Sequence, residues 1–276
     1  MFKLSYWTLG MPAWTNEEFV AKASELGYGA IDIRCADGAN ISTSSSDEEI
    51  ETLKKTFASK GVGIASLLAY QKRGNGKEPV TDWDAVAEDL VAHARLAQKL
   101  DNVPVRITVG DTDPSTPMEQ YLAKLGDATK VALQEVPTSR FMYQNHAGSA
   151  KAGELGDLVE AINNPRCGLG YSPDHCYVER EDPMALADRY GPVIQQLHIA
   201  DRKPLPNDDF GPCWIGDGIV PHGAILETLS KHGFDGWISL KWEKGNRSDM
   251  VEGDVVLPHY VDYMKRITAE APKQTA

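Results

Sequence analysis

Four short apolar runs in the second half of the chain decide the fold: RFMYQNH (140–146), CGLGYSPDH (167–175), IQQLHIAD (194–201) and WISLKWE (237–243). Each run begins as a buried strand does and ends in Gln, His, Asp, Lys or Glu. Polar side chains gathered at the carboxyl ends of parallel strands are typical of the active site of an α/β barrel. The runs therefore predict both the architecture and the place of the functional site.

Strand-like and helix-like segments alternate along the whole chain. The strand candidates are 3–9, 29–34, 61–68, 103–109, 140–145, 167–172, 194–200 and 236–242. The amphipathic helix candidates are 16–27, 46–61, 81–100, 153–162, 182–191, 223–233 and 258–271. This alternation predicts a (β/α)8 TIM barrel, formed as a single domain over residues 1–276 with a frayed carboxyl end. An open doubly wound sheet is the alternative, and the lack of a Gly-x-Gly-x-x-Gly turn after the first strand counts against it.

Charge and composition exclude several classes of partner. The formal net charge is -12, and no cluster of Lys and Arg is present, which argues against nucleic acid as a partner. No apolar run approaches the roughly 18 residues of a membrane span, and the amino terminus is typical of a first strand, not of a signal peptide. The four cysteines form no Cys-x-x-Cys pair, so we expect buried reduced thiols and a cytoplasmic location.

Two longer loops are expected beside the pocket. YQKRGNGKEPVTD (70–82) follows the third strand, and DRKPLPNDDFGPCWIGDG (201–218) follows the seventh. In a barrel both lie at the carboxyl face, where such loops form the site. Long loops without secondary structure of their own are usually lids or binding loops.

Three segments carry a resemblance to a known family. They are GYGAIDIR (27–34), QLHIAD (196–201) and IGDGIVPHGAILETLSKHGFDGWISLKWEK (215–244). The chain resembles the xylose isomerase-like sugar isomerase/epimerase family over almost its whole length. This family is sometimes grouped with endonuclease IV-type barrels.

The resemblance implies a metal site that this sequence has altered. Family members typically bind one divalent cation (Mn²⁺, Mg²⁺ or Zn²⁺) with Glu, Asp, His and Glu from strands five to eight, and the cation acts as a Lewis acid. The matching positions here are Gln144, Ser172, His198 and Lys241, so the histidine alone is retained. Each unit charge pair at about 4 Å is worth about 4 kcal/mol at an effective dielectric near 20. We therefore expect no metal and no other cofactor, although a shifted site of Asp174, Glu243, His146 and His175 remains open.

Four residues are the candidates for catalysis. Lys241 and Glu243 fall on one face of the eighth strand, so a Lys–Glu pair is expected to replace the cation. The ammonium would stabilise an enediolate oxygen, and the carboxylate would move a proton. His146 and His198 are candidates for general acid and base or for donors to substrate hydroxyls. A structural ion pair and hydrogen-bonded core histidines are the alternatives.

Seven further residues are candidates for substrate binding. Arginines inside or beside strands suit an anion or a sugar oxygen, and tryptophans suit the apolar face of a sugar. Internal salt bridges, core packing and turn chemistry are the alternatives for these residues. The candidates are Gln144, Asp174, His175, Arg106, Arg34, Trp7 and Trp214.

The sequence thus predicts a sugar or cyclitol isomerase/epimerase-like enzyme that transfers a proton next to a carbonyl, without the metal of the family. A metal-dependent enzyme with shifted ligands, a keto-sugar lyase and a non-catalytic sugar-binding subunit remain alternatives. The expected partner is a small carbohydrate, and homo-oligomerisation is open. An endonuclease IV-like activity is disfavoured by the charge of -12 and by the altered ligand set.

Overall fold

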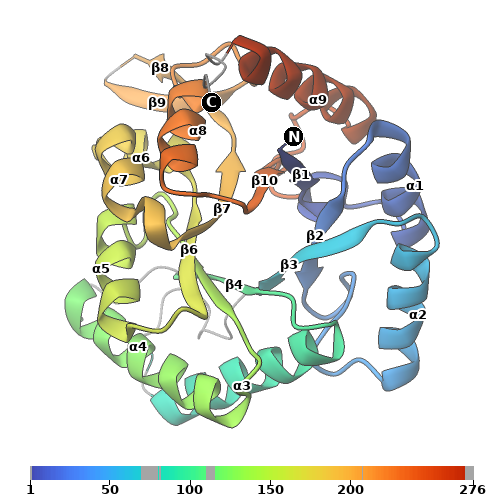
Figure 1. Cartoon of the computed structure of the whole chain (residues 1–276), viewed down its shortest axis with the longest axis vertical. Coiled ribbons are helices and arrows are strands. Elements are labelled where there is room, and N and C mark those ends of the chain that lie inside the picture. The colour runs from blue at the N-terminus through green and yellow to red at the C-terminus, as the bar shows by residue number, and fades with distance from the viewer. Residues whose placement is uncertain (1, 70–79, 81, 110–115, 207, 271–276) are drawn as a thin grey trace.

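Eight parallel strands form a nearly closed barrel in the computed structural model, which describes residues 2–69, 80, 82–109, 116–206 and 208–270 (Figure 1). The order around the barrel is β1-β10-β7-β6-β5-β4-β3-β2, and isolated bridging between Trp7 and Asp32 links β1 to β2. The predicted TIM barrel is therefore confirmed, with all eight strands in the expected places. The strands are β1 (Lys3–Tyr6), β2 (Ala30–Cys35), β3 (Gly63–Ala69), β4 (Val105–Thr108), β5 (Phe141–Gln144), β6 (Cys167–Tyr171), β7 (Ile194–Ile199) and β10 (Trp237–Leu240).

The helices form an outer ring that follows the chain order, so that α9 closes the ring beside α1 (Figure 1). The predicted capping box at Ser46 and Glu49 is present at the start of α2, and Thr15 with Glu18 forms another at α1. The α-helices are α1 (Asn16–Leu26), α2 (Asp47–Ala58), α3 (Trp83–Lys99), α4 (Met118–Glu135), α5 (Ala152–Ile162), α6 (Pro173–Val178), α7 (Pro183–Tyr190), α8 (His222–Lys231) and α9 (Gly253–Glu270). Short 3-10 turns, η1 (Thr8–Gly10) and η2 (Gly191–Val193), follow β1 and precede β7.

Three elements differ from the sequence prediction: α4, the segment after β7, and α6, where a turn was expected after Pro173. Helix α4 was not expected, and Gly126 in its middle lowers the helical propensity of the segment. A Cβ at this position would lie 3.1 Å from the Leu158 side chain of α5, so the glycine serves the close packing of the two helices. The segment after β7 was expected to be a loop, but it forms an antiparallel hairpin of β8 (Asp201–Leu205) and β9 (Asp209–Cys213). Prolines in both strands are tolerated because each strand of a two-stranded sheet is an edge.

A polar layer fills the barrel on the amino-terminal side of the strand ends. Asp32 is fully buried and accepts hydrogen bonds from the hydroxyls of Ser5, Ser66 and Ser239 and from the Gln196 amide. Burial raises the pKa of this carboxyl, and the four hydrogen bonds oppose that shift. Because strand side chains alternate, the next inward positions of β7 and of the chain after β10 are His198 and Lys241. The layer thus forms the floor of the site.

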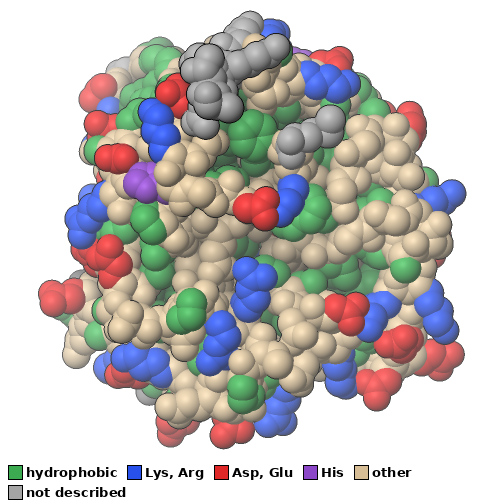
Figure 2. Space-filling model, viewed as in Figure 1, with side chains coloured by type: hydrophobic (Ala, Val, Ile, Leu, Met, Phe, Trp, Pro, Cys, Tyr) green, Lys and Arg blue, Asp and Glu red, His purple; other side chains and the backbone are tan. Residues whose placement is uncertain are grey.

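Surface charge and hydropathy agree with the composition. On the face shown in Figure 2, Lys and Arg side chains alternate with Asp and Glu side chains, and neither sign forms a broad patch. None of the described helices is long and apolar enough to cross a membrane.

Three of the four cysteines are buried, Cys213 is half-buried, and all four are free thiols. The expected loop at 70–82 and the frayed carboxyl end lie largely outside the described residues.

Candidate active site

Three of the strand-end positions form one hydrogen-bonded chain. Gln144 ends β5, Ser172 follows β6 and His198 lies on β7, and all three side chains are fully buried. The Gln144 Nε2 atom donates to Ser172 Oγ at 2.8 Å, and Ser172 Oγ lies 3.3 Å from His198 Nδ1. The Asn145 side chain fixes Ser172 by accepting from its backbone N–H at 2.8 Å and donating to its carbonyl at 2.9 Å. The sequence pattern therefore correctly predicted that these ends meet.

A buried ion cluster lies beside this chain. Lys241 Nζ lies 2.9 Å from each carboxylate oxygen of Asp174 and donates to His175 Nε2 at 2.5 Å. Asp174 and His175 are on α6, not on the turn that the Pro173 context suggested. The carboxylate also pairs with Arg202 of β8 at 3.2 Å. Two cations and one anion leave the cluster with one net positive charge.

The expected Lys241–Glu243 pair is not the arrangement found among the described residues. The carboxylate that pairs with Lys241 is that of Asp174, because α6 turns back over the strand ends after Ser172. Glu243 is half-buried and lines a cavity of about 110 Å³ together with Lys241, Asp174 and Arg202. The three ammonium protons of Lys241 are taken by two carboxylate oxygens and one imidazole nitrogen. Lys241 can therefore act on a bound molecule through its charge.

Electrostatics keep the cluster charged and its histidines neutral. Burial would raise the pKa of Asp174, but the charges of Lys241 and Arg202 outweigh burial and hold the pKa well below the usual range of an aspartate. Burial lowers the pKa of His175 and of His198 well below the ordinary value, and nearby cations act in the same direction. Burial and the charge of Lys241 also lower the pKa of His146. All three imidazoles are thus neutral at neutral pH.

His146 presents one nitrogen as a base. Its Nδ1 atom lies 2.9 Å from the carbonyl oxygen of Ala147, and a carbonyl only accepts hydrogen bonds. Nδ1 therefore carries the proton, and Nε2 carries a lone pair. The ring packs against that of His175, with centroids 4.5 Å apart, and the half-buried side chain lies within electrostatic reach of Glu243.

The remaining candidates are spread around the same end of the barrel. Arg106 is buried and stacks over the ring of Trp7, with the guanidinium carbon 4.7 Å from the ring centroid. Arg34 of β2 lines a cavity of about 310 Å³ with Thr8 and Asn40. Trp214 is engaged within the protein, since its indole N–H donates to His259 Nδ1 at 3.1 Å. Asn145 and Arg202 were missed by the sequence prediction, because no local pattern marks their contacts.

The donor set does not fit the divalent cation that the resemblance implies. An amide and a hydroxyl replace two of the three carboxylate ligands and form a hydrogen-bonded chain with the retained imidazole, and an ammonium replaces the third carboxylate. Within the described residues, no group of three or more His, Cys, Asp or Glu side chains is placed to hold a metal ion. The shifted set of the alternative hypothesis would require Asp174 and His175 to release Lys241. We therefore derive no step through a metal.

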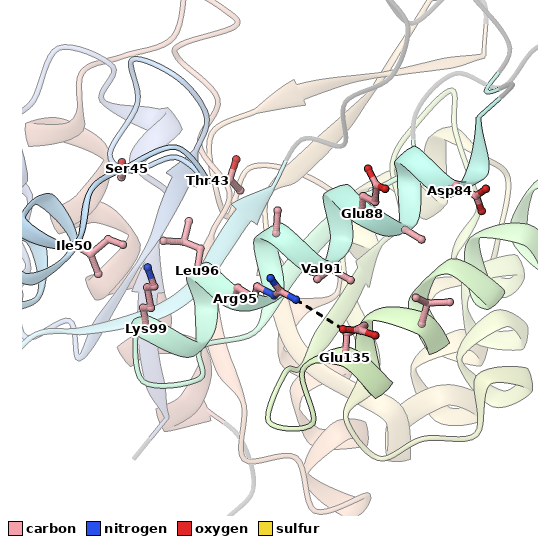
Figure 3. Close-up of a pocket in the computed structure, with 13 residues that line it drawn as sticks. Thr43, Ser45, Ile50, Asp84, Glu88, Val91, Arg95, Leu96, Lys99 and Glu135 are labelled. Atoms are coloured by element: carbon pink, nitrogen blue, oxygen red, sulfur yellow. Dashed lines mark ion pairs between the residues drawn. The ribbon is translucent and has the colours of Figure 1, made fainter.

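A separate groove lies on the outer helical layer (Figure 3). It has a volume of about 740 Å³ and is lined by α3, by Val131 and Glu135 of α4 and by the segment around the start of α2. The dashed line marks the ion pair of Arg95 and Glu135 at 3.7 Å, and both side chains are more than half exposed. The residues that line this groove include none of the strand-end residues described above, so we assign the groove no part in the site.

Comparison with known proteins places the chain among related barrels. Residues 20–266 match the family model described as xylose isomerase-like TIM barrel. The chain is 25% identical over 140 residues to inosose dehydratase of Lacticaseibacillus casei, a match that covers 45% of this chain and 45% of that protein. The chain thus matches less than half of the length of this relative.

Two solved structures show the shared fold. The D-psicose 3-epimerase of Clostridium cellulolyticum H10, solved with D-tagatose, has a TM-score of 0.68 at 16% identity, with 99% of this chain and 93% of that chain covered. The 3-keto-D-glucoside 4-epimerase of E. coli has a TM-score of 0.72 at 11% identity, with 98% and 100% covered. At these identities the likeness concerns the fold alone.

Proposed function

This chain belongs to the xylose isomerase-like TIM barrel family, and we propose that it transfers a proton next to the carbonyl of a sugar or cyclitol without a divalent metal. The family includes enzymes that isomerise, epimerise or dehydrate such molecules. The observation that carries the proposal is the buried cluster of Lys241, Asp174 and Arg202, which holds a net positive charge at the strand ends. Removing a proton next to a carbonyl creates negative charge on oxygen, and a fixed cation in a buried site stabilises that charge.

We assign the role of base to His146. Its Nε2 lone pair is set by the Nδ1–H bond to the Ala147 carbonyl, and its lowered pKa keeps the ring neutral. The base takes the proton from the carbon next to the carbonyl, the C–H electrons form a carbon–carbon double bond, and the carbonyl π electrons move to oxygen. We assign the return or relay of the proton to Glu243, whose charge acts on His146. Retention of rate in His146→Gln would move the role to Glu243.

The enolate has two productive outcomes. Return of the proton to the opposite face of the same carbon gives an epimer. Its delivery to the former carbonyl carbon, with transfer of the α-hydroxyl proton to the former carbonyl oxygen, gives an isomer. Departure of a hydroxyl from the next carbon, as water with the abstracted proton, gives an unsaturated ketone. The 25% identity to an inosose dehydratase favours this second candidate, which is a lyase reaction with the same first step.

Exchange of the α-proton tests the step that all of these reactions share. The full chain would be incubated in D2O with an inosose (a keto-cyclitol), D-fructose or D-tagatose, and loss of the C–H signal would be followed by NMR. We expect exchange that resists EDTA and that falls about 10²-fold or more in Lys241→Met. Exchange that disappears with EDTA and returns with Mn²⁺ would support the metal-dependent alternative. Tight sugar binding without exchange would support a non-catalytic subunit.

The cellular setting remains part of this proposal. Four free thiols, three of them buried, suit a reducing compartment, and we expect the protein to act in the cytoplasm. The substrate is expected to be a single small carbohydrate. Homo-oligomerisation is left to measurement of the mass in solution.

A further inference from the structure

Three buried polar atoms at the strand ends lack a hydrogen-bond partner among the described residues. They are Trp7 Nε1, His198 Nε2 and Gln144 Oε1, and their side chains are 1%, 0% and 0% exposed. A buried donor or acceptor left unpaired costs about 1–3 kcal/mol. Buried polar groups are otherwise almost always paired. The two donors, Trp7 Nε1 and His198 Nε2, belong to rings in contact, and they indicate the binding position of an acceptor group of a ligand.

The hydrogen-bonded chain at the strand ends favours the tautomer of His198 that carries its proton on Nε2. The Gln144 amide donates to Ser172 Oγ, so the hydroxyl proton of Ser172 is available for His198 Nδ1 at 3.3 Å. An Nδ1 atom that accepts this proton is unprotonated, and the proton of the neutral ring then lies on Nε2. His198 thus presents an N–H donor at the atom that has no partner.

Two neighbouring residues fix the position of the His198 ring. A Cβ at Gly170 would lie 2.8 Å from His198 Cε1, so the ring rests against a strand that has no side chain there. The ring also meets Trp7 edge to face, with centroids 5.1 Å apart and planes at 80°. The indole N–H of Trp7 is a donor only. The guanidinium of Arg106 stacked on Trp7 adds positive charge at the same place.

We propose that Trp7 Nε1–H and His198 Nε2–H bind the carbonyl oxygen of the substrate and the negative charge that this oxygen acquires. This rests on the proposed function, and it supplies the direct contacts that Lys241 does not provide. The three ammonium protons of Lys241 are already used by Asp174 and His175. Lys241 therefore contributes charge at a distance, while the two ring N–H groups are the donors.

The assignment makes Trp7 and His198 catalytic residues, and Ser172 a positioning residue. During proton removal the carbonyl π electrons move to the oxygen, which becomes an oxyanion between the two donors. No proton passes through His198, so it acts as an electrophile and not as an acid or base. The sequence suggested either an acid–base role or donation to a substrate hydroxyl, and the role proposed here is donation to the carbonyl oxygen.

The tautomer of His198 can be measured without any ligand. In the ¹⁵N-histidine-labelled full chain, long-range ¹⁵N–¹H NMR distinguishes Nε2–H from Nδ1–H, and His198→Gln identifies the signal. We expect Nε2–H in the wild type and its loss as the dominant form in Ser172→Ala. A dominant Nδ1–H tautomer in the wild type would overturn the proposal, whether or not the chain acts on keto-sugars.

Exchange kinetics test the two donors on an inosose, D-fructose or D-tagatose. Removing one donor of this kind lowers kcat by about 10²–10³-fold, so we expect that loss in Trp7→Phe and in His198→Asn with little change in KM. His198→Gln places an amide N–H near the position of Nε2 and should recover part of the rate. Trp237→Phe is the matched control. Trp237 begins β10, at the end of the strand away from the site, so this variant should keep the wild-type rate.

The two kinds of failure are distinguishable. Wild-type exchange that survives Trp7→Phe and His198→Asn within threefold would refute the donor assignment and leave the proposed function intact. If the wild type exchanges no proton in any of the three probes, the proposed function fails. The NMR tautomer then decides the donor assignment alone.

Discussion

Breaking the buried ion pair of Lys241 and Asp174 should cost far more stability than breaking a surface pair. Both side chains are 1% exposed. Removing one partner of a buried pair leaves an uncompensated charge and costs about 3–5 kcal/mol. Lys241→Met should cost about 3 kcal/mol, because Arg202 at 3.2 Å still neutralises Asp174. Asp174→Asn should cost about 5 kcal/mol, because it leaves two cations facing each other.

Urea unfolding of the full chain, followed by far-UV circular dichroism, measures these free energies. The double variant Lys241→Met with Asp174→Asn should cost less than the sum of the single variants, since neither charge is then left unpaired by the loss of the other. Lys3 and Asp235 offer a matched control pair, with a 2.6 Å contact and side chains 44% and 84% exposed. Lys3→Met should cost less than about 1 kcal/mol.

The comparison of Lys241→Met with Lys3→Met tests whether the Lys241–Asp174 pair is desolvated. Equal losses in Lys241→Met and Lys3→Met would show that the buried pair is not desolvated as the structure implies. Additive losses in the double variant would show that Lys241 and Asp174 do not depend on each other. Either result would remove the fixed cation on which the proposed function depends.

Three further predictions concern the site. Because the pKa of His146 is lowered from its ordinary value of 6.5, the midpoint of the acid-side fall in kcat/KM for exchange should lie below pH 6.5; a midpoint above pH 7 would contradict this. Gly170→Ala should displace the His198 ring, lower the rate at least tenfold and cost about 1–3 kcal/mol in urea unfolding. Calorimetry with Mn²⁺ should show no binding to the wild type and about one ion per chain in a variant with the three replaced carboxylates restored. That variant carries Gln144→Glu, Ser172→Asp and Lys241→Glu.

The strands were predictable from sequence because their signal is local. Each is a short apolar run that ends in polar residues, and the structure confirmed all eight. Helix α4 was missed because a glycine in mid-segment, Gly126, lowers the local helical propensity. In the structure this glycine lets α4 approach Leu158 of α5. The hairpin of β8 and β9 was missed for a similar reason. Its prolines argue against a strand locally, and they are tolerated because both strands are edges.

The site was predictable in position and less so in its contacts. Barrel geometry brings the ends of β5, β6 and β7 together, so the meeting of Gln144, Ser172 and His198 follows from the pattern. The partner of Lys241 does not follow from it. The alternation of side chains pointed to Glu243, two residues further along the chain. The carboxylate found beside Lys241 is that of Asp174, which lies on α6 after β6. Such a contact depends on how α6 turns, which local sequence does not determine.

Charge balance explains why the replacements at the strand ends are consistent with one another. In the family that the sequence resembles, three carboxylates around a divalent ion leave a net charge of one negative unit. Here Lys241 and Arg202 around Asp174 leave one positive unit. Gln144 and Ser172 are neutral, so neither of them competes with Asp174 for the ammonium. The positive charge of the site therefore comes from side chains of the protein itself. Its presence should depend on folding and not on the concentration of a metal ion.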